Sequence, residues 1–413
     1  MIRRPGVVLA LFTGLNLLNY LDRYVLAAVL PKVQGELGLS NTVAGLLGTV
    51  FLAGYSVTSP IFGALGDRMR RTLLIALGIF VWSAATCASG LAAGALSLLA
   101  ARAFVGVGEA SYATLSPTII DDTTPEARKG RALAIFYAAA PIGSALGYLV
   151  GGFVEKRYGW RGAFFVAGGP GLALALVSLL VHEPARKLNE NAKAEPLRDL
   201  RHLVSIPAYK KAVLGYCAYT AAIGGFSFWA PKFLVARYAM DLGKGNFVFG
   251  IVTVVAGAIG TLVGGRLADA RVAKAEAGLS DERDREAAFV EAQLTVCAVG
   301  SLVGAPLAVA CFLSPSPTLF FAFAFVAMLF LFLGSSPINA ALLRSVPTEL
   351  RASAMALAIL AIHALGDFWS PPLVGALADV LPIHVAMLAL PVGIAASAAI
   401  WWPRRTPHAA RAS

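Results

Sequence analysis

The chain has 413 residues, of which 58% are hydrophobic and only 14% are charged, and its mean hydropathy is +0.73. A soluble domain carries about 25% charged residues, so this composition excludes a soluble protein and predicts an integral membrane protein. The net charge of +11 would suit a nucleic-acid partner, and the placement of the basic residues must decide whether one is needed.

Apolar stretches long enough to cross a bilayer recur along the chain and predict an all-α fold of twelve transmembrane helices. We expect an N-terminal six-helix bundle over 1–182, a cytoplasmic linker over 183–208, a C-terminal six-helix bundle over 209–402 and a cytoplasmic tail over 403–413. The expected spans are 6–30, 41–65, 72–91, 94–120, 130–154, 162–181, 209–235, 246–268, 290–313, 317–342, 353–378 and 383–402.

The basic residues follow this topology. Of the 34 Lys and Arg residues, 25 lie in or next to the predicted cytoplasmic segments and seven in or next to the predicted external loops. This is the positive-inside distribution, and it places both termini in the cytoplasm. We therefore expect a multi-pass protein of the bacterial inner membrane, with no nucleic-acid partner.

The first predicted helix carries a polar stripe. Asn16, Asn19 and Asp22 recur at a spacing of three and so share one helix face, whereas Arg23 is turned by about 100° toward another partner. For the two asparagines, hydrogen bonding between helices is an equally good interpretation.

The fourth predicted helix contains Arg102 and Glu109. A charge at this depth is expensive unless it faces protein or water and finds a partner, so each is a functional candidate. Seven residues separate them, which places them on one face but about 10 Å apart along the axis. We predict that Arg102 pairs with Asp22 and that Glu109 exchanges protons, because burial opposes the charged carboxylate while a nearby cation favours it.

Arg23 and Arg102 are also suited to bind an anionic headgroup, since guanidinium pairs with phosphate in a bidentate manner. The alternative is that Asp22 and Glu109 occupy both arginines. The two interpretations are compatible if they apply to different conformational states.

A motif returns at every third helix. Gly63, Asp67, Arg68 and Arg71 mark its first copy, and a second copy ends in Asp269, where Ala270 replaces the first arginine. Weaker copies occur at 151–155 and 375–379. Three-helix units that alternate in orientation are typical of alternating-access carriers.

These residues resemble the major facilitator superfamily over nearly the whole chain. Within it, NYLDRYVLAAVLP in helix 1, GVGEASYATLSPTIIDD in helix 4 and FWAPKFL in helix 7 resemble the spinster family, whose members move lysolipids and sphingosine-1-phosphate. The resemblance implies two six-helix bundles of inverted repeats, with helices 1, 4, 7 and 10 around a central cavity. It also implies a cytoplasmic gate in which Asp67 caps a helix near Thr348 and Asp269 caps one near Thr124.

Weaker patterns concern aromatic side chains and a second polar pair. Tyr112, Phe228 and Trp229 are candidates to line an apolar substrate site, although packing explains such aromatics equally well. His363 and Asp367 are four residues apart and share a helix face, so we expect a polar pair, with a second proton site as the alternative. The four cysteines have no metal-ligand spacing.

The sequence therefore predicts a secondary transporter, not an enzyme, that moves an amphipathic anionic lipid of the lysophospholipid or sphingosine-1-phosphate type by alternating access with proton coupling. The alternative is a proton-coupled small organic-anion symporter or a drug exporter of the same superfamily. We expect no cofactor and no metal, since the chain has no phosphate-binding loop of the ATPase type, and we expect a monomer.

Overall fold

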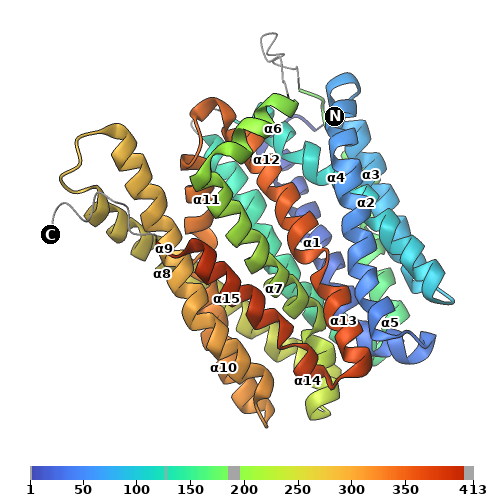
Figure 1. The fold of residues 1–413 in the computed structure, drawn as a ribbon. Helices are drawn as coiled ribbons and strands as arrows, with labels where there is room; N and C mark the ends of the chain where they lie inside the picture. The colour runs from blue at the N-terminus through green and yellow to red at the C-terminus, as the bar shows by residue number, and fades with distance from the viewer. Residues whose placement is uncertain (1, 126–127, 185–195, 404–413) are drawn as a thin grey trace. The chain divides into compact units, whose positions relative to one another are not determined.

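The computed structural model describes residues 2–125, 128–184 and 196–403, which are helical apart from connections and one isolated bridge between Ile2 and Val181 (Figure 1). The helices of the first half are α1 (Pro5–Leu37), α2 (Asn41–Arg68), α3 (Arg71–Gly90), α4 (Ala95–Thr123) and α5 (Lys129–Ser178). Those that follow are α6 (Pro196–Ser205), α7 (Pro207–Tyr238), α8 (Leu242–Glu276), α9 (Glu282–Leu313), α10 (Pro317–Phe332), α11 (Ser335–Arg344), η2 (Thr348–Leu350), α12 (Arg351–Ile362), η3 (His363–Asp367), α13 (Ser370–Val380), α14 (Ile383–Ala386) and α15 (Ala389–Trp401).

The predicted all-α fold of twelve spans is confirmed. Within the described ranges, nine helical stretches are long and apolar enough to cross a membrane. One of them, α5, holds two spans that meet at Gly159, where a φ of 73° breaks the helix. The remaining two spans are α1 and α4, the helices that carry the buried charges.

Three predicted spans are interrupted helices. The stretch 317–342 is divided into α10 and α11, 353–378 into α12, the π-helical turn η3 and α13, and 383–402 into α14 and α15. Pro337, Pro371 and Pro391 each follow one of these breaks by no more than five residues. Proline has no N–H to donate, so it weakens the helix on its N-terminal side.

The chain forms two compact units, which are described separately. Unit 1 comprises residues 1–192, 225–254 and 368–386, and unit 2 comprises 193–224, 255–367 and 387–413. Unit 1 therefore contains segments from both halves of the sequence, and the predicted domain bounds at 182 and 209 stay a prediction. Linker residues 185–195 and most of the predicted tail, from 404, lie outside the described residues.

Close packing of α1 on α5 organises unit 1. A Cβ at Gly143 would lie 2.4 Å from the carbonyl oxygen of Leu17, and one at Gly147 would lie 2.7 Å from that of Leu21. Only glycine allows the two backbones to approach so closely. This contact brings the polar stripe of α1 into the interior, where Asn16 donates to the carbonyl of Phe136 at 2.9 Å.

Asp379, near the end of α13, caps the N-terminus of α2 within unit 1. Its carboxylate accepts from the backbone N–H of Asn41 at 2.7 Å and of Thr42 at 3.0 Å, and from the Thr42 hydroxyl at 2.6 Å. Two of the N–H groups that a helix start leaves unpaired are thus satisfied. The weak motif copy that ends at Asp379 therefore forms a helix-capping contact, which we call the α13 cap.

Unit 2 has its own core, in which Tyr209 donates to the carbonyl of Ala354 at 2.6 Å and Trp401 donates to that of Ala212 at 3.2 Å.

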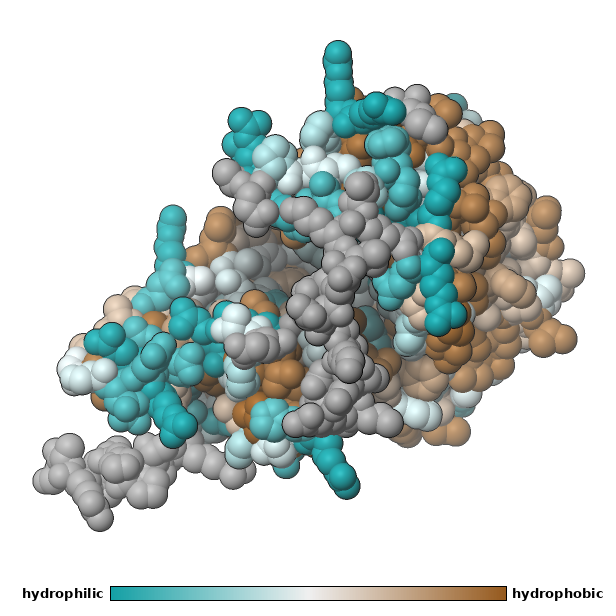
Figure 2. Space-filling model, turned by 90° about the horizontal axis from the view of Figure 1, so that it is seen from above, coloured by the Kyte–Doolittle hydropathy of each residue, from teal (hydrophilic) through white to brown (hydrophobic). Residues whose placement is uncertain are grey.

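The surface separates hydrophilic from apolar side chains. In the view from above, hydrophilic side chains gather on the face toward the viewer, and apolar side chains cover the right side (Figure 2). Large apolar side chains such as Phe104 and Phe153 are exposed, as expected of a surface that faces lipid.

Candidate functional site

Four ionisable side chains meet inside unit 1. Asp22 and Arg23 come from α1, and Arg102 and Glu109 come from α4. The side chains of Asp22, Arg102 and Glu109 are at most 2% exposed, whereas that of Arg23 is 18% exposed. We call these four residues the charge cluster.

Arg23 and Glu109 form its tighter ion pair. The Nε atom of Arg23 lies 2.6 Å from Oε2 of Glu109. The guanidinium also lies 5.0 to 5.2 Å from the ring centroids of Tyr20, Phe51 and Tyr55, which is the range of cation–π attraction. Glu109 has no exposed surface, so of this pair only Arg23 is reached by solvent.

Arg102 and Asp22 form a looser pair, as predicted. Their nearest nitrogen and oxygen are 3.9 Å apart, and Asp22 accepts a hydrogen bond from the hydroxyl of Thr86 on α3. Nη1 and Nε of Arg102, and Oδ1 of Asp22, make no hydrogen bond to any residue in the described ranges. Buried charges with unused hydrogen-bonding capacity are costly for stability, which is typical of residues kept for function.

Phe51 and Thr86 contact the charge cluster, and the sequence did not predict either contact. The Phe51 ring centroid lies 5.1 Å from the guanidinium carbon of Arg23 and 5.1 Å from that of Arg102, so one ring lies against both arginines. Neither residue belongs to a charged motif, and their roles depend on how α2 and α3 pack against α1 and α4. The sequence contained no signal for them.

Two predicted substrate-lining aromatics are buried. Tyr112 donates to the backbone carbonyl of Phe12 and packs against Trp82, with ring centroids 5.3 Å apart. Trp229 donates to the carbonyl of Pro371 at 2.9 Å. Both have no exposed surface and hold helices together in this state, whereas Phe228 is partly exposed. Substrate contact by these three residues stays a prediction, and Asn19 is buried within the same unit.

Of the predicted gate residues, Arg71 has the best-defined partners. It lies 2.8 Å from Asp122 and 3.1 Å from Glu183, and Glu183 also accepts from the backbone N–H of Thr72 at 2.9 Å. Although partial burial acts in the opposite direction, these hydrogen bonds hold the pKa of Glu183 below its ordinary value. Arg71 thus links α3 to α4 and to the segment after α5.

The other gate residues lie at helix ends. Asp67 and Arg68 are exposed at the end of α2, Gly63 is one turn earlier, and Asp269 is exposed on α8. The predicted caps by Asp67 and Asp269 join unit 1 to unit 2 and therefore stay predictions.

The predicted polar pair of unit 2 is formed. Nδ1 of His363 lies 3.1 Å from each carboxylate oxygen of Asp367, within the π-helical turn η3. Its role in proton exchange stays a prediction. Across the described residues, no group of three or more His, Cys, Asp or Glu side chains is arranged to hold a metal ion.

Comparison with known proteins agrees with this architecture. Residues 12–283 match the Major Facilitator Superfamily, and residues 309–384 match the Organic Anion Transporter Polypeptide family. A crystal structure of a bacterial homolog to the human lysosomal transporter spinster, in an inward-facing and unoccupied conformation, matches with a TM-score of 0.83 and 21% identity over 96% of each chain. These matches define a membrane transporter of the major facilitator fold.

Two curated relatives narrow the assignment. "Probable sphingolipid transporter spinster homolog 2" of Arabidopsis thaliana is 32% identical and matches over 96% of this chain and 86% of its own length. "Protein spinster" of Drosophila melanogaster is 35% identical over 90% of this chain, which spans 61% of the fly protein. The chain belongs to the spinster family of the major facilitator superfamily, and it is a multi-pass transporter rather than an enzyme.

Proposed function

We propose that the protein moves an amphipathic anionic lipid, of the lysophospholipid or sphingosine-1-phosphate type, by alternating access coupled to protons. The observation that carries this proposal is the Arg23–Glu109 pair, in which a partly exposed guanidinium lies 2.6 Å from a fully buried carboxylate. The name of the Arabidopsis relative, which describes a sphingolipid transporter, supports a lipid substrate. The positive-inside distribution supports cytoplasmic termini in a bacterial inner membrane.

The mechanism follows from competition for Arg23. Without substrate, Arg23 binds Glu109 and keeps it charged. A phosphate headgroup offers Arg23 a second, bidentate partner, and Arg102, whose Nη1 and Nε are unused within the described residues, adds a second guanidinium. Once Arg23 turns to the headgroup, Glu109 is a buried carboxylate without a cation, and it takes up a proton because burial disfavours its charge.

Proton and anion binding then assist each other. By thermodynamic linkage, a headgroup that promotes protonation of Glu109 must bind more tightly when Glu109 is already protonated. Both ligands leave together when the cavity opens to the side where protons are scarce and Arg23 returns to Glu109. The same logic suits symport of a small organic anion, which the match of residues 309–384 to the organic-anion family keeps as a second candidate.

The test is uptake into liposomes with the purified protein. Lysophospholipid and a small carboxylate are compared with and without an inward pH gradient, in the wild type, Glu109→Gln and Glu155→Gln. Glu155 serves as the control because it pairs with Lys32 at 3.5 Å and is outside the charge cluster. We expect gradient-driven lysophospholipid uptake that Glu109→Gln abolishes and Glu155→Gln retains.

Two results would contradict the proposal. Uptake of the carboxylate but not of the lipid would show that the substrate is a small organic anion and not a lipid. A Glu109→Gln variant with wild-type dependence on the pH gradient would remove Glu109 from proton coupling. The abundance and unfolding temperature of each variant are measured first, so that loss of fold is not mistaken for loss of coupling.

A further inference from the structure

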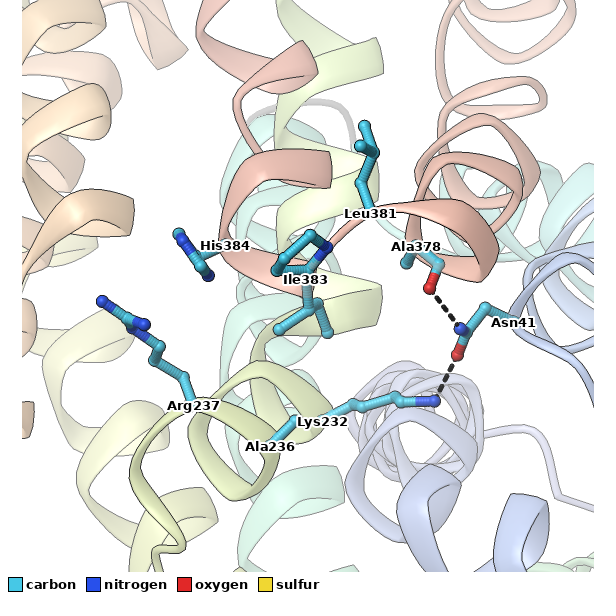
Figure 3. Close-up of a pocket in the computed structure, with 9 residues that line it drawn as sticks. Asn41, Lys232, Ala236, Arg237, Ala378, Leu381, Ile383 and His384 are labelled. Carbon is cyan, nitrogen blue, oxygen red and sulfur yellow. Dashed lines mark hydrogen bonds between the residues drawn. The ribbon is translucent and has the colours of Figure 1, made fainter.

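A cavity of about 440 Å³ lies in unit 1 away from the charge cluster, where the end of α7 meets the connection from α13 to α14. Its lining includes Lys232, Arg237 and His384, together with Asn41 at the start of α2 (Figure 3). No aspartate or glutamate of the described residues lines it. The cavity is therefore rich in donors and positive charge.

Arg237 and His384 lie on the same side of this cavity (Figure 3), close enough to interact electrostatically. Neither side chain makes a hydrogen bond or an ion pair to a residue within the described ranges. The guanidinium carries five N–H donors and the imidazole at least one, and an anion placed between the two side chains would accept from both.

The other charges around the cavity are already paired. Lys232 donates to Gln34 at 2.6 Å and to Asn41, and both of these partners are neutral amides. Asp379 is close enough to Lys232 to interact with it electrostatically, but its two carboxylate oxygens are engaged by the N-terminus of α2 in the α13 cap. Its charge is thus directed toward α2, and no carboxylate of the described residues lines the cavity beside Arg237.

Apolar surface borders the cavity on the α13–α14 side. Val380 is 79% exposed, Leu381 is 41% exposed and Val385 is 37% exposed. Exposed aliphatic side chains beside a basic pocket at a helix end suit a ligand with an anionic head and acyl chains, because the guanidinium pairs with the head group while the aliphatic side chains contact the chains.

We propose that this cavity binds the phosphate group of an anionic membrane lipid, with Arg237 as the principal contact and His384 as the second. In the predicted topology the ends of α7 and α13 are external, so the lipid would come from the outer face of the membrane. The site is built from α7, α13 and α14 and is separate from Arg23 and Arg102, so it does not depend on the proposed transport function.

The experiment measures ligand-dependent thermal stability of the purified full-length protein in a neutral detergent. Short-chain phosphatidylglycerol is titrated against short-chain phosphatidylcholine and against inorganic phosphate, in the wild type, Arg237→Gln and Arg157→Gln. Arg157 is the matched control, because it is an exposed arginine of unit 1, on α5, that does not line the cavity. Unfolding without ligand shows whether each variant is folded.

We expect phosphatidylglycerol to raise the unfolding temperature of the wild type and of Arg157→Gln, and phosphatidylcholine to do so less. Loss of the charged hydrogen bonds of Arg237 should raise the half-saturating concentration of phosphatidylglycerol about tenfold in Arg237→Gln. His384→Gln, which removes the smaller contact, should raise it several-fold and serves as the test if Arg237→Gln does not fold.

Three outcomes would overturn the proposal. Equal responses to the two lipids would show that charge is not recognised. Equal responses of the cavity variants and Arg157→Gln would place the lipid elsewhere. Stabilisation by inorganic phosphate at the concentration at which phosphatidylglycerol acts would assign the cavity to a free anion rather than to a lipid.

Discussion

The Arg23–Glu109 pair predicts an unusual pH dependence of stability when its cation is removed. In Arg23→Gln, Glu109 stays fully buried but loses the guanidinium at 2.6 Å. Arg102 remains in the charge cluster, but it is paired with Asp22, so we expect the buried Glu109, which has lost its nearest cation, to fold in its neutral form. The folded state then carries a proton that the unfolded state, in which a glutamate titrates near pH 4.3, releases at neutral pH.

The magnitude follows from linkage. Because the folded variant binds one more proton than the unfolded chain, its free energy of unfolding falls as the pH rises, by about 1.4 kcal/mol per pH unit above pH 4.3. At pH 5 this amounts to about 1 kcal/mol, and at pH 7 to about 3.7 kcal/mol. The latter value lies within the roughly 3–5 kcal/mol that breaking a buried ion pair costs.

The assay compares the unfolding temperature of the wild type, Arg23→Gln, Glu109→Gln and the double variant between pH 5 and pH 8. Arg23→Gln should lose stability steeply with rising pH relative to the wild type, whereas Glu109→Gln and the double variant, which lack the carboxylate, should not. The double variant should therefore be more stable than Arg23→Gln at pH 8. Parallel pH profiles for Arg23→Gln and the double variant would refute the reasoning.

Three further predictions concern packing and caps. Asp379→Asn removes the charge that caps α2 and should lower the free energy of unfolding by about 1 kcal/mol, as measured by thermal unfolding. A cysteine introduced at the start of α2 should also be labelled faster in this variant. Glu183→Gln should destabilise at pH 7 because the pKa of Glu183 is lowered in the fold, and the difference from the wild type should shrink once the pH falls below about 4.3 and vanish only below the lowered pKa. Gly143→Ala should weaken the packing of α1 on α5, since its Cβ would lie 2.4 Å from a carbonyl oxygen, and lower the yield of folded protein.

The controls are drawn from the same helices. Gly169→Ala places a methyl group where no atom lies within 4 Å, so it should fold as the wild type does, and equal yields for it and Gly143→Ala would contradict the packing argument. A difference between wild type and Glu183→Gln that persists unchanged at pH 3.5 would show that the effect is not electrostatic. Unaltered labelling in Asp379→Asn would mean that the cap does not hold α2.

Much of the fold was predictable because the length and hydropathy of an apolar stretch identify a membrane-spanning helix. The sequence identified α1 and α4 as spans even though both carry charges, since the apolar run continues on either side of Arg23 and Arg102. It did not predict that the last three spans are interrupted. A proline marks each break, but proline inside α1, α2 and α4 leaves the helix continuous, so the residue alone does not distinguish the two outcomes.

The site was predictable in its members but not in all its contacts. The family resemblance, which places helices 1 and 4 at one cavity, brought Asp22 to Arg102, and the cost of buried charge marked Glu109. The partner of Glu109 depends on how far α1 is rotated against α4, which one sequence does not specify. For the same reason the α13 cap was visible only as a weak repeat, and its role became clear when Asp379 was found against the backbone of Asn41 and Thr42.

Two of the seams between the two units cut through helices, and a third lies at the end of a π-helical turn. They pass through α7 between Gly224 and Gly225, through α8 at Val254, and beside η3 at Asp367. We predict that the chain bends at these places. Tandem glycines and a widened π turn suit such elastic joints, because neither holds the regular ladder of an α-helix firmly. Stiffening them with alanine should slow turnover without touching any charged residue.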